Sequence, residues 1–131
     1  MGDILESNIK IDASIIKKKL KEVLNDKDIL DLTSDKKVYF IHANNPKPPY
    51  IEYQVIRSRG SEYSEGNIDY LNHLVQIDIF SLGDYTNLET IIINKFIKAG
   101  FEYNPGSPDL FEEKTGLYHK PLRFNIDLPT S

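Results

Sequence analysis

The chain has 131 residues, a formal net charge of −4 and no cysteine. A chain of this length folds as one domain with its own core, so we expect residues 1–131 to form a single domain; disulfides, thiol catalysis and zinc–cysteine sites are excluded. Its apolar runs are too short to span a membrane, its acidic N-terminus does not fit a secretory signal peptide, and its acidic balance argues against broad binding to nucleic acid phosphates.

The first predicted helix begins after Asp12, which can cap it, and runs to about Leu24. One stripe of its surface is apolar, as in a helix that packs on a core. This stripe comprises Ile15, Ile16, Leu20, Val23 and Leu24. Four lysines mostly fall off it: Lys17, Lys18, Lys19 and Lys21. We interpret these lysines as a solvated face, and the alternative is a surface for an acidic partner.

Two strands are predicted next, on either side of a proline-rich connection. Residues 37–43 (KVYFIHA) are rich in β-formers, and NNPKPPY after them cannot form a regular ladder. Residues 51–59 alternate, with Ile51, Tyr53 and Val55 on one face and polar residues on the other. The polar stretch Gly60–Asn67 is bounded by a glycine and is predicted to be a mobile loop.

The longest predicted strand, residues 70–81 (YLNHLVQIDIFS), has the alternation of a half-buried antiparallel strand. A second helix follows it. Thr86 and Glu89 have the spacing of a capping box, and a wide apolar stripe continues towards Ile97. Gly100 followed by Phe101 predicts a left-handed C-terminal cap with an apolar contact.

The last predicted element is a β-hairpin with strands at residues 110–113 and 117–128. Tyr118 is expected on the apolar core face, as is Tyr53. Pro121 has no N–H to donate, which predicts a sheet edge or a bulge there. The expected fold is therefore α+β, with two helices on one face of an antiparallel sheet and the order α-β-β-β-α-β-β.

No catalytic or metal-binding motif is present. His42, His73 and His119 are single residues on predicted strands, without an HxH or HxxxH pair, so no metal site is predicted. We expect His119 to face solvent or an interface, because no carboxylate stands at a spacing that would orient it. Glu52 and Asp78 can be cross-strand neighbours, which we interpret as a hydrated polar face. The sequence predicts no enzyme and no cofactor.

Two segments carry a resemblance to a known family. They are PYIEYQVIRSRGSEYSEG…YLNHLVQIDIFSLGDYTNLETIIINKFIKAGF and DLFEEKTGLYHKPLRFNID, within Pro49–Asp127. This part of the chain resembles the tail terminator, or tail-completion, proteins of tailed phages and prophages. The most characteristic pieces are VQIDIFS-x-GDYT and LYHKPLRF, which are family-like sequences and not a chemical signature.

The resemblance implies a structural virion protein of the tail and neck, assembled in the bacterial cytoplasm. Such proteins form a homohexameric ring that caps the head-proximal end of the tail tube, ends its polymerisation and joins it to the head–tail connector. Implied partners are other copies of the chain, the tail tube protein, the connector, and a sheath protein where the tail is contractile. DNA passes through the lumen without specific binding, and no membrane and no cofactor are involved.

On this reading, polar surface residues are predicted to contact a neighbouring subunit or the tube: Arg57, Arg59, Glu62, Glu65, His119 and Arg123. A second set is predicted to line the lumen and repel DNA: Asp78, Glu112 and Glu113. Two alternatives stay open. One is a head-completion or connector ring of the same neck, and the other is a small hydrolase or nucleotide-binding protein, which requires a pocket with perturbed titratable groups.

Overall fold

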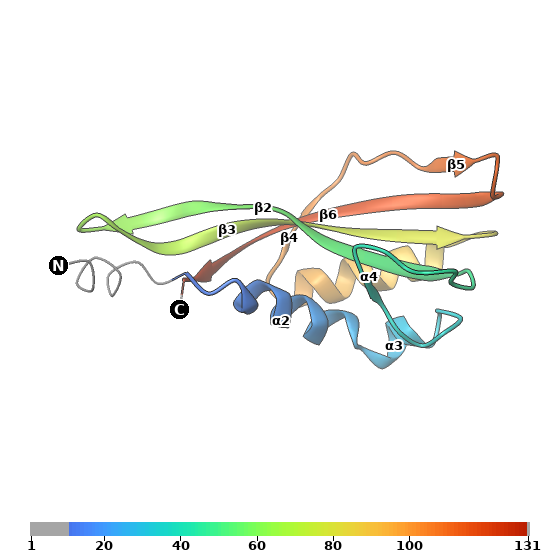
Figure 1. The fold of residues 1–131 in the computed structure, drawn as a ribbon, viewed down its shortest axis with the longest axis horizontal. Coiled ribbons are helices and arrows are strands. Elements are labelled where there is room, and N and C mark those ends of the chain that lie inside the picture. The colour runs from blue at the N-terminus through green and yellow to red at the C-terminus, as the bar shows by residue number, and fades with distance from the viewer. Residues whose placement is uncertain (1–10, 131) are drawn as a thin grey trace.

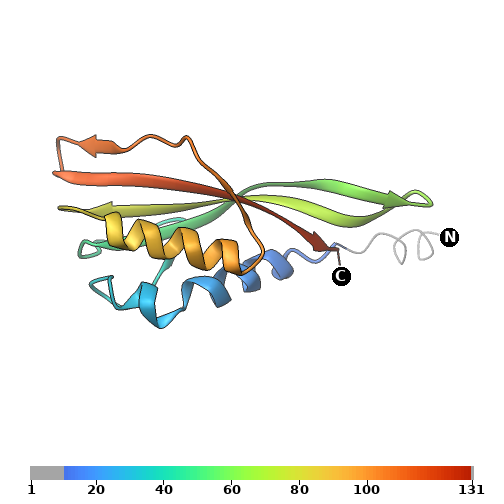
Figure 2. The ribbon, with the colours of Figure 1, turned by 180° about the vertical axis from the view of Figure 1, so that it is seen from behind.

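A computed structural model describes residues 11–130 and has the mixed α+β fold that the sequence predicts. In this range, three helices accompany one sheet of six strands, ordered β1-β2-β3-β6-β4, with β5 also paired to β6. The helices lie on one side of the sheet in both views (Figures 1 and 2). The expectation about a signal peptide rests on residues 1–10, which lie outside the described part.

The helices are α2 (Ser14–Leu24), α3 (Lys27–Leu30) and α4 (Thr86–Lys98). The predicted role of Asp12 is confirmed, because its carboxylate accepts a 2.9 Å hydrogen bond from the N–H of Ser14. The sequence did not predict α3, a single turn. The Asp26 carboxylate accepts from the N–H of Asp28 at its start, and Lys95 of α4 lies 3.1 Å from the same carboxylate. This contact ties α3 to α4.

Both ends of α4 follow from local chemistry. At the N-terminus Asp84, not Thr86, supplies the cap, because its carboxylate accepts from both the N–H and the hydroxyl of Thr86. The predicted C-terminal cap is confirmed: Gly100 has φ +100°, and the N–H of Phe101 bonds to the carbonyl of Phe96 at 3.0 Å. The Phe96 and Phe101 rings, 4.8 Å apart, complete the motif.

The strands are β1 (Tyr39–Phe40), β2 (Tyr50–Ser64), β3 (Asn67–Ser81), β4 (Glu102–Asn104), β5 (Leu110–Glu112) and β6 (Leu117–Pro129). The strand predicted at residues 37–43 is reduced to β1, and β1 pairs parallel with β2 although the rest of the sheet is antiparallel. Its early end has a local reason. Ile41 takes φ +65°, which no strand can continue.

The predicted mobile loop at Gly60–Asn67 is wrong, because this stretch belongs to the β2–β3 hairpin. Each strand has 15 residues, and Ser64 pairs with Asn67 next to the turn. Glu65 and Gly66 form that turn with φ of 50° and 80°, the left-handed pair of a two-residue hairpin turn. The hairpin extends well past the helices, as Figure 1 shows at the left.

A break in the pairing of β2 changes which side chains share a face. Val55 pairs with Val75 and Arg57 with Leu74, which leaves Ile56 as an extra residue. Strict alternation would place Arg57 and Arg59 on the core face with Tyr53. The extra residue instead turns both arginines to the opposite face of the sheet, the one without helices.

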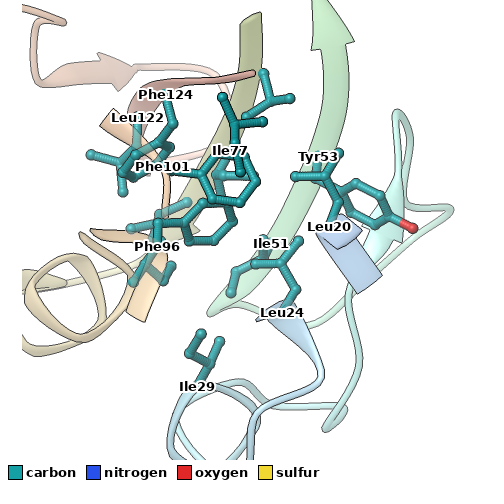
Figure 3. Close-up of a cluster of buried hydrophobic side chains, with 14 of the residues drawn as sticks. Leu20, Leu24, Ile29, Ile51, Tyr53, Ile77, Phe96, Phe101, Leu122 and Phe124 are labelled. Atoms are coloured by element: carbon teal, nitrogen blue, oxygen red, sulfur yellow. The ribbon is translucent and has the colours of Figure 1, made fainter. Parts of the chain in front are cut away.

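The core lies between the helices and the odd-numbered face of β3. Its fully buried members include Ile92 and, as labelled in Figure 3, Leu20, Leu24, Ile29, Ile51, Ile77, Phe96, Leu122 and Phe124. Phe96 of α4 stacks on Phe124 of β6 with ring centroids 4.5 Å apart. Tyr53 is buried as predicted, but Tyr118 is 40% exposed. Tyr118 lies on the predicted face of β6, but beyond the end of the core.

The edge predicted at Pro121 is confirmed. β4 pairs with residues 123–125 of β6, and β5 pairs with residues 117–119 of the same strand. Between them β6 has only β3 as a partner, where Pro121 lies opposite Asp78. The chain from β4 to β5 leaves the edge here and passes above β6 in Figure 1, on the side away from the helices.

Candidate functional site

The main concavity of the described residues is a groove on the sheet face without helices. Its volume is about 720 Å³. The floor comes from β2, β3 and β6, and the segment after β4 forms one wall. Lining residues used below are Arg57, Gln76, Asn104, Pro105–Pro108, His119 and Arg123. The bulge at Ile56 and the edge at Pro121 therefore create this groove together: the first supplies Arg57, and the second detaches the wall.

A chain of hydrogen bonds crosses the floor from β6 to β3 and back. His119 Nε2 lies 2.7 Å from Asp78 Oδ1, which also accepts from the amide of Gln76 at 2.9 Å. Arg123 Nε donates to the carbonyl oxygen of that amide at 2.9 Å. Asp78 is buried, and these hydrogen bonds satisfy its carboxyl group within the groove floor. The expectation that no carboxylate orients His119 is wrong, because the sheet register supplies one from a strand 41 positions away.

Aromatic rings also stack against the imidazole of His119. The ring of Phe80 stacks on His119 with centroids 4.3 Å apart, and Tyr50 stacks on Phe80 at 4.8 Å. These residues come from three adjacent strands, on the same face as Glu52 and Asp78, whose predicted pairing is confirmed. A stacked and hydrogen-bonded imidazole has a fixed orientation, with Nε2 committed to Asp78.

The groove is basic although the chain is acidic overall. Arg57, Arg123 and His119 line it, and no acidic side chain is among the lining residues of the described chain. Within residues 11–130 neither arginine has a carboxylate at ion-pair distance. Arg123 uses its Nε for Gln76, and within residues 11–130 its two terminal nitrogens have no side-chain hydrogen-bond partner. Such a guanidinium suits two-pronged binding of a carboxylate.

A buried lysine fastens the wall of the groove. Lys120, only 7% exposed, donates to the carbonyl of Ser107 at 2.7 Å. Its ammonium also lies 3.6 Å from Asp109 and 3.8 Å from Glu89 of α4. The Tyr85 hydroxyl donates to Asp109, and this bond, with the nearby lysine, lowers the pKa of the Asp109 carboxyl. Burial, followed by the contact with Asp109, raises the pKa of Tyr85.

In the described chain, His119 Nε2 bonds to Asp78, and no serine, threonine or tyrosine hydroxyl is hydrogen-bonded to the same imidazole. Across residues 11–130, no three His, Asp or Glu side chains gather as metal ligands. Nor does any helix there have the length and apolar character to cross a membrane.

The structure divides the predicted site residues into three places. Arg57, His119 and Arg123 meet at the groove, with the predicted lumen residue Asp78 buried beneath them. Asp78 is thus no exposed acid, and we remove it from the lumen set. Arg59 lies on the same face, opposite Asn72 in the register of β2 with β3. The other predicted acids are exposed at two separate hairpins: Glu62 and Glu65 on β2–β3, Glu112 and Glu113 on β5–β6.

Sequence reasoning missed the amides that organise this face. Asn72 donates to Asp127 at 2.9 Å and accepts from Asn125 at 2.8 Å. Asn125 in turn accepts from Asn104 of β4. The even-numbered polar positions of the predicted strand 70–81 were the available signal, but only the register between strands tells which amides meet.

A scan against models of known protein families finds no match for this chain, and a search of curated proteins finds no significant relative.

Proposed function

We propose that this protein is a structural virion protein of the tail terminator kind, which forms a ring at the head-proximal end of a phage tail tube or phage-tail-like particle. The ring ends tube polymerisation and joins the tail to the head connector. The resemblance of Pro49–Asp127 suggests this role. The structural observation that supports it is a single sheet with two unlike surfaces: a protruding hairpin with an acidic tip (Figure 1) and a basic groove.

Unlike surfaces on one subunit are what a cyclic assembly needs. In a ring, one patch of each subunit meets a different patch on the next, and the contact repeats until it closes. In this proposal, the groove residues bind a partner protein and catalyse no reaction. The proposed partners are therefore proteins: further copies of the chain, the tail tube and the connector, with a sheath where the tail contracts.

The test is the mass of the purified protein, alone and with polymerising tail-tube subunits, followed by imaging of the tubes. Six copies of the 15.1 kDa chain have a mass of roughly 91 kDa. We expect a particle of that mass, or shortened tubes with a cap at one end. A persistent monomer that leaves tube length unchanged contradicts the proposal. Binding to filled capsids in place of tubes would favour the head-completion alternative.

A further inference from the structure

The basic groove and the tip of the β2–β3 hairpin have opposite charge. The tip, residues 61–69, carries Glu62, Glu65 and Asp69 and no basic residue. All three acids are exposed and have no cationic partner within residues 11–130. The groove presents Arg57 and Arg123, equally without a carboxylate partner. In a chain with an excess of acids, this separation gives two complementary surfaces.

The tip also offers an aromatic anchor. Tyr63 is 66% exposed, and its ring packs against Gly60 of the same strand. It lies across Gly60, where an added Cβ would come within 2.7 Å of the ring carbon Cζ. The Tyr63 ring can therefore occupy this position only because Gly60 has no side chain. An exposed, positioned tyrosine between two carboxylates is typical of residues that anchor protein interfaces.

The tip cannot reach the groove of its own chain. Arg57 and the tip share strand β2, which pairs with β3 up to the turn. At 3.3 Å per residue, Glu62 lies about 17 Å and Glu65 about 26 Å beyond Arg57 along the strand. In Figure 1 the β2–β3 hairpin extends away from the end of the sheet that carries β5. Only a second molecule can bring the two surfaces together.

We propose that the hairpin tip of one copy docks in the basic groove of the next copy, with Glu62 and Glu65 paired to Arg57 and Arg123 and with Tyr63 against the proline-rich wall Pro105–Pro108. Each copy then gives one tip and one groove, which is a heterologous contact. This inference rests on the proposed function, because it names the contact between ring subunits.

The experiment reverses each surface separately. One variant carries Glu62→Arg and Glu65→Arg; the other carries Arg57→Glu and Arg123→Glu. Each variant alone has tip and groove of like charge, and we expect its self-association to weaken by about 100-fold or more, measured by sedimentation. In an equimolar mixture, every tip again meets a groove of opposite sign. We therefore expect the mixture, and a variant with all four changes, to regain the wild-type assembly.

The matched control is Glu112→Arg with Glu113→Arg, which reverses two exposed acids at the other hairpin and should leave self-association unchanged. Rescue in the mixture also proves that both variants are folded. Two results overturn the tip–groove contact but leave the proposed ring intact. Either every variant still assembles into rings like those of the wild type, or the two variants assemble neither alone nor in the mixture. Tip–groove association without tube capping instead overturns the proposed function.

Discussion

At the scale of single residues, we expect the buried histidine of β3 to make the fold less stable in acid. His73 is 4% exposed, and its Nδ1 lies 2.6 Å from the Ser58 hydroxyl. Burial lowers the pKa of His73 below its ordinary 6.5, although the carboxylate of Asp127 opposes this shift. The unfolded chain thus binds a proton more readily than the folded one. Stability from the neutral His73 is full above about pH 6.5 and falls as the pH drops below it.

We expect His73→Gln to reduce this loss. Glutamine keeps a polar group near Ser58 but does not titrate, so the free energy of unfolding should fall less between pH 7 and pH 5 than in the wild type. A single proton contributes at most about 1.4 kcal/mol per pH unit. Urea unfolding at both pH values measures the difference. His42→Gln, at an exposed histidine, is the control, and equal slopes for wild type and His73→Gln would contradict the argument.

At the scale of elements, the groove depends on a wall that has no ladder to hold it. The chain between β4 and β5 leaves the sheet where Pro121 interrupts the edge. Lys120 replaces the missing ladder with its bonds to Ser107 and the nearby acids. A buried ammonium thus holds the backbone that forms one wall of the groove.

Lys120→Met tests this role. Methionine keeps the apolar stem but leaves the carbonyl of Ser107 without its donor, which should destabilise the fold by roughly 1–3 kcal/mol. Amide hydrogen exchange should rise around Ser107 while the amides of β3 stay protected. The exposed Lys114→Met serves as control. Unchanged exchange in the wall would show that other contacts hold it.

The helices and strands also differ in how well the sequence predicts them. Alternation and caps act within a few residues, so α2, α4, β3 and the β5–β6 hairpin were predicted near their observed places. The β2–β3 tip was predicted as a loop because its residues are polar. The two-residue turn Glu65–Gly66 is identified by its left-handed backbone, which the structure shows. The bulge at Ile56 was missed because Val55 and Ile56 fit a strand equally well, yet it decides the face of Arg57.

The candidate site was less predictable than the fold. His119 and Arg123 were named as surface contacts, but their partners Asp78 and Gln76 lie on another strand, 41 and 47 positions away. Only the register of β3 against β6 brings such residues together, and periodicity within one strand carries no information about it.

At the scale of the whole molecule, the proposed ring makes a prediction about DNA. Glu112 and Glu113 are exposed at the turn between β5 and β6, far along the chain from the acids of the hairpin tip. If the ring stands around the path of the genome with this turn inward, their charges repel phosphates and let DNA slide. Rings of the Glu112→Arg, Glu113→Arg variant should then bind duplex DNA.

The measurement is the mobility of a short duplex with assembled rings over a range of salt concentrations. Wild-type rings should leave the duplex free at physiological salt, whereas the variant should retain it, with an affinity that falls steeply as salt rises. Glu22→Arg, an exposed acid on α2, controls for the general gain of positive charge. Equal DNA retention by the control and the variant would place Glu112 and Glu113 outside the lumen, because an outer wall attracts DNA without regard to which acid is reversed.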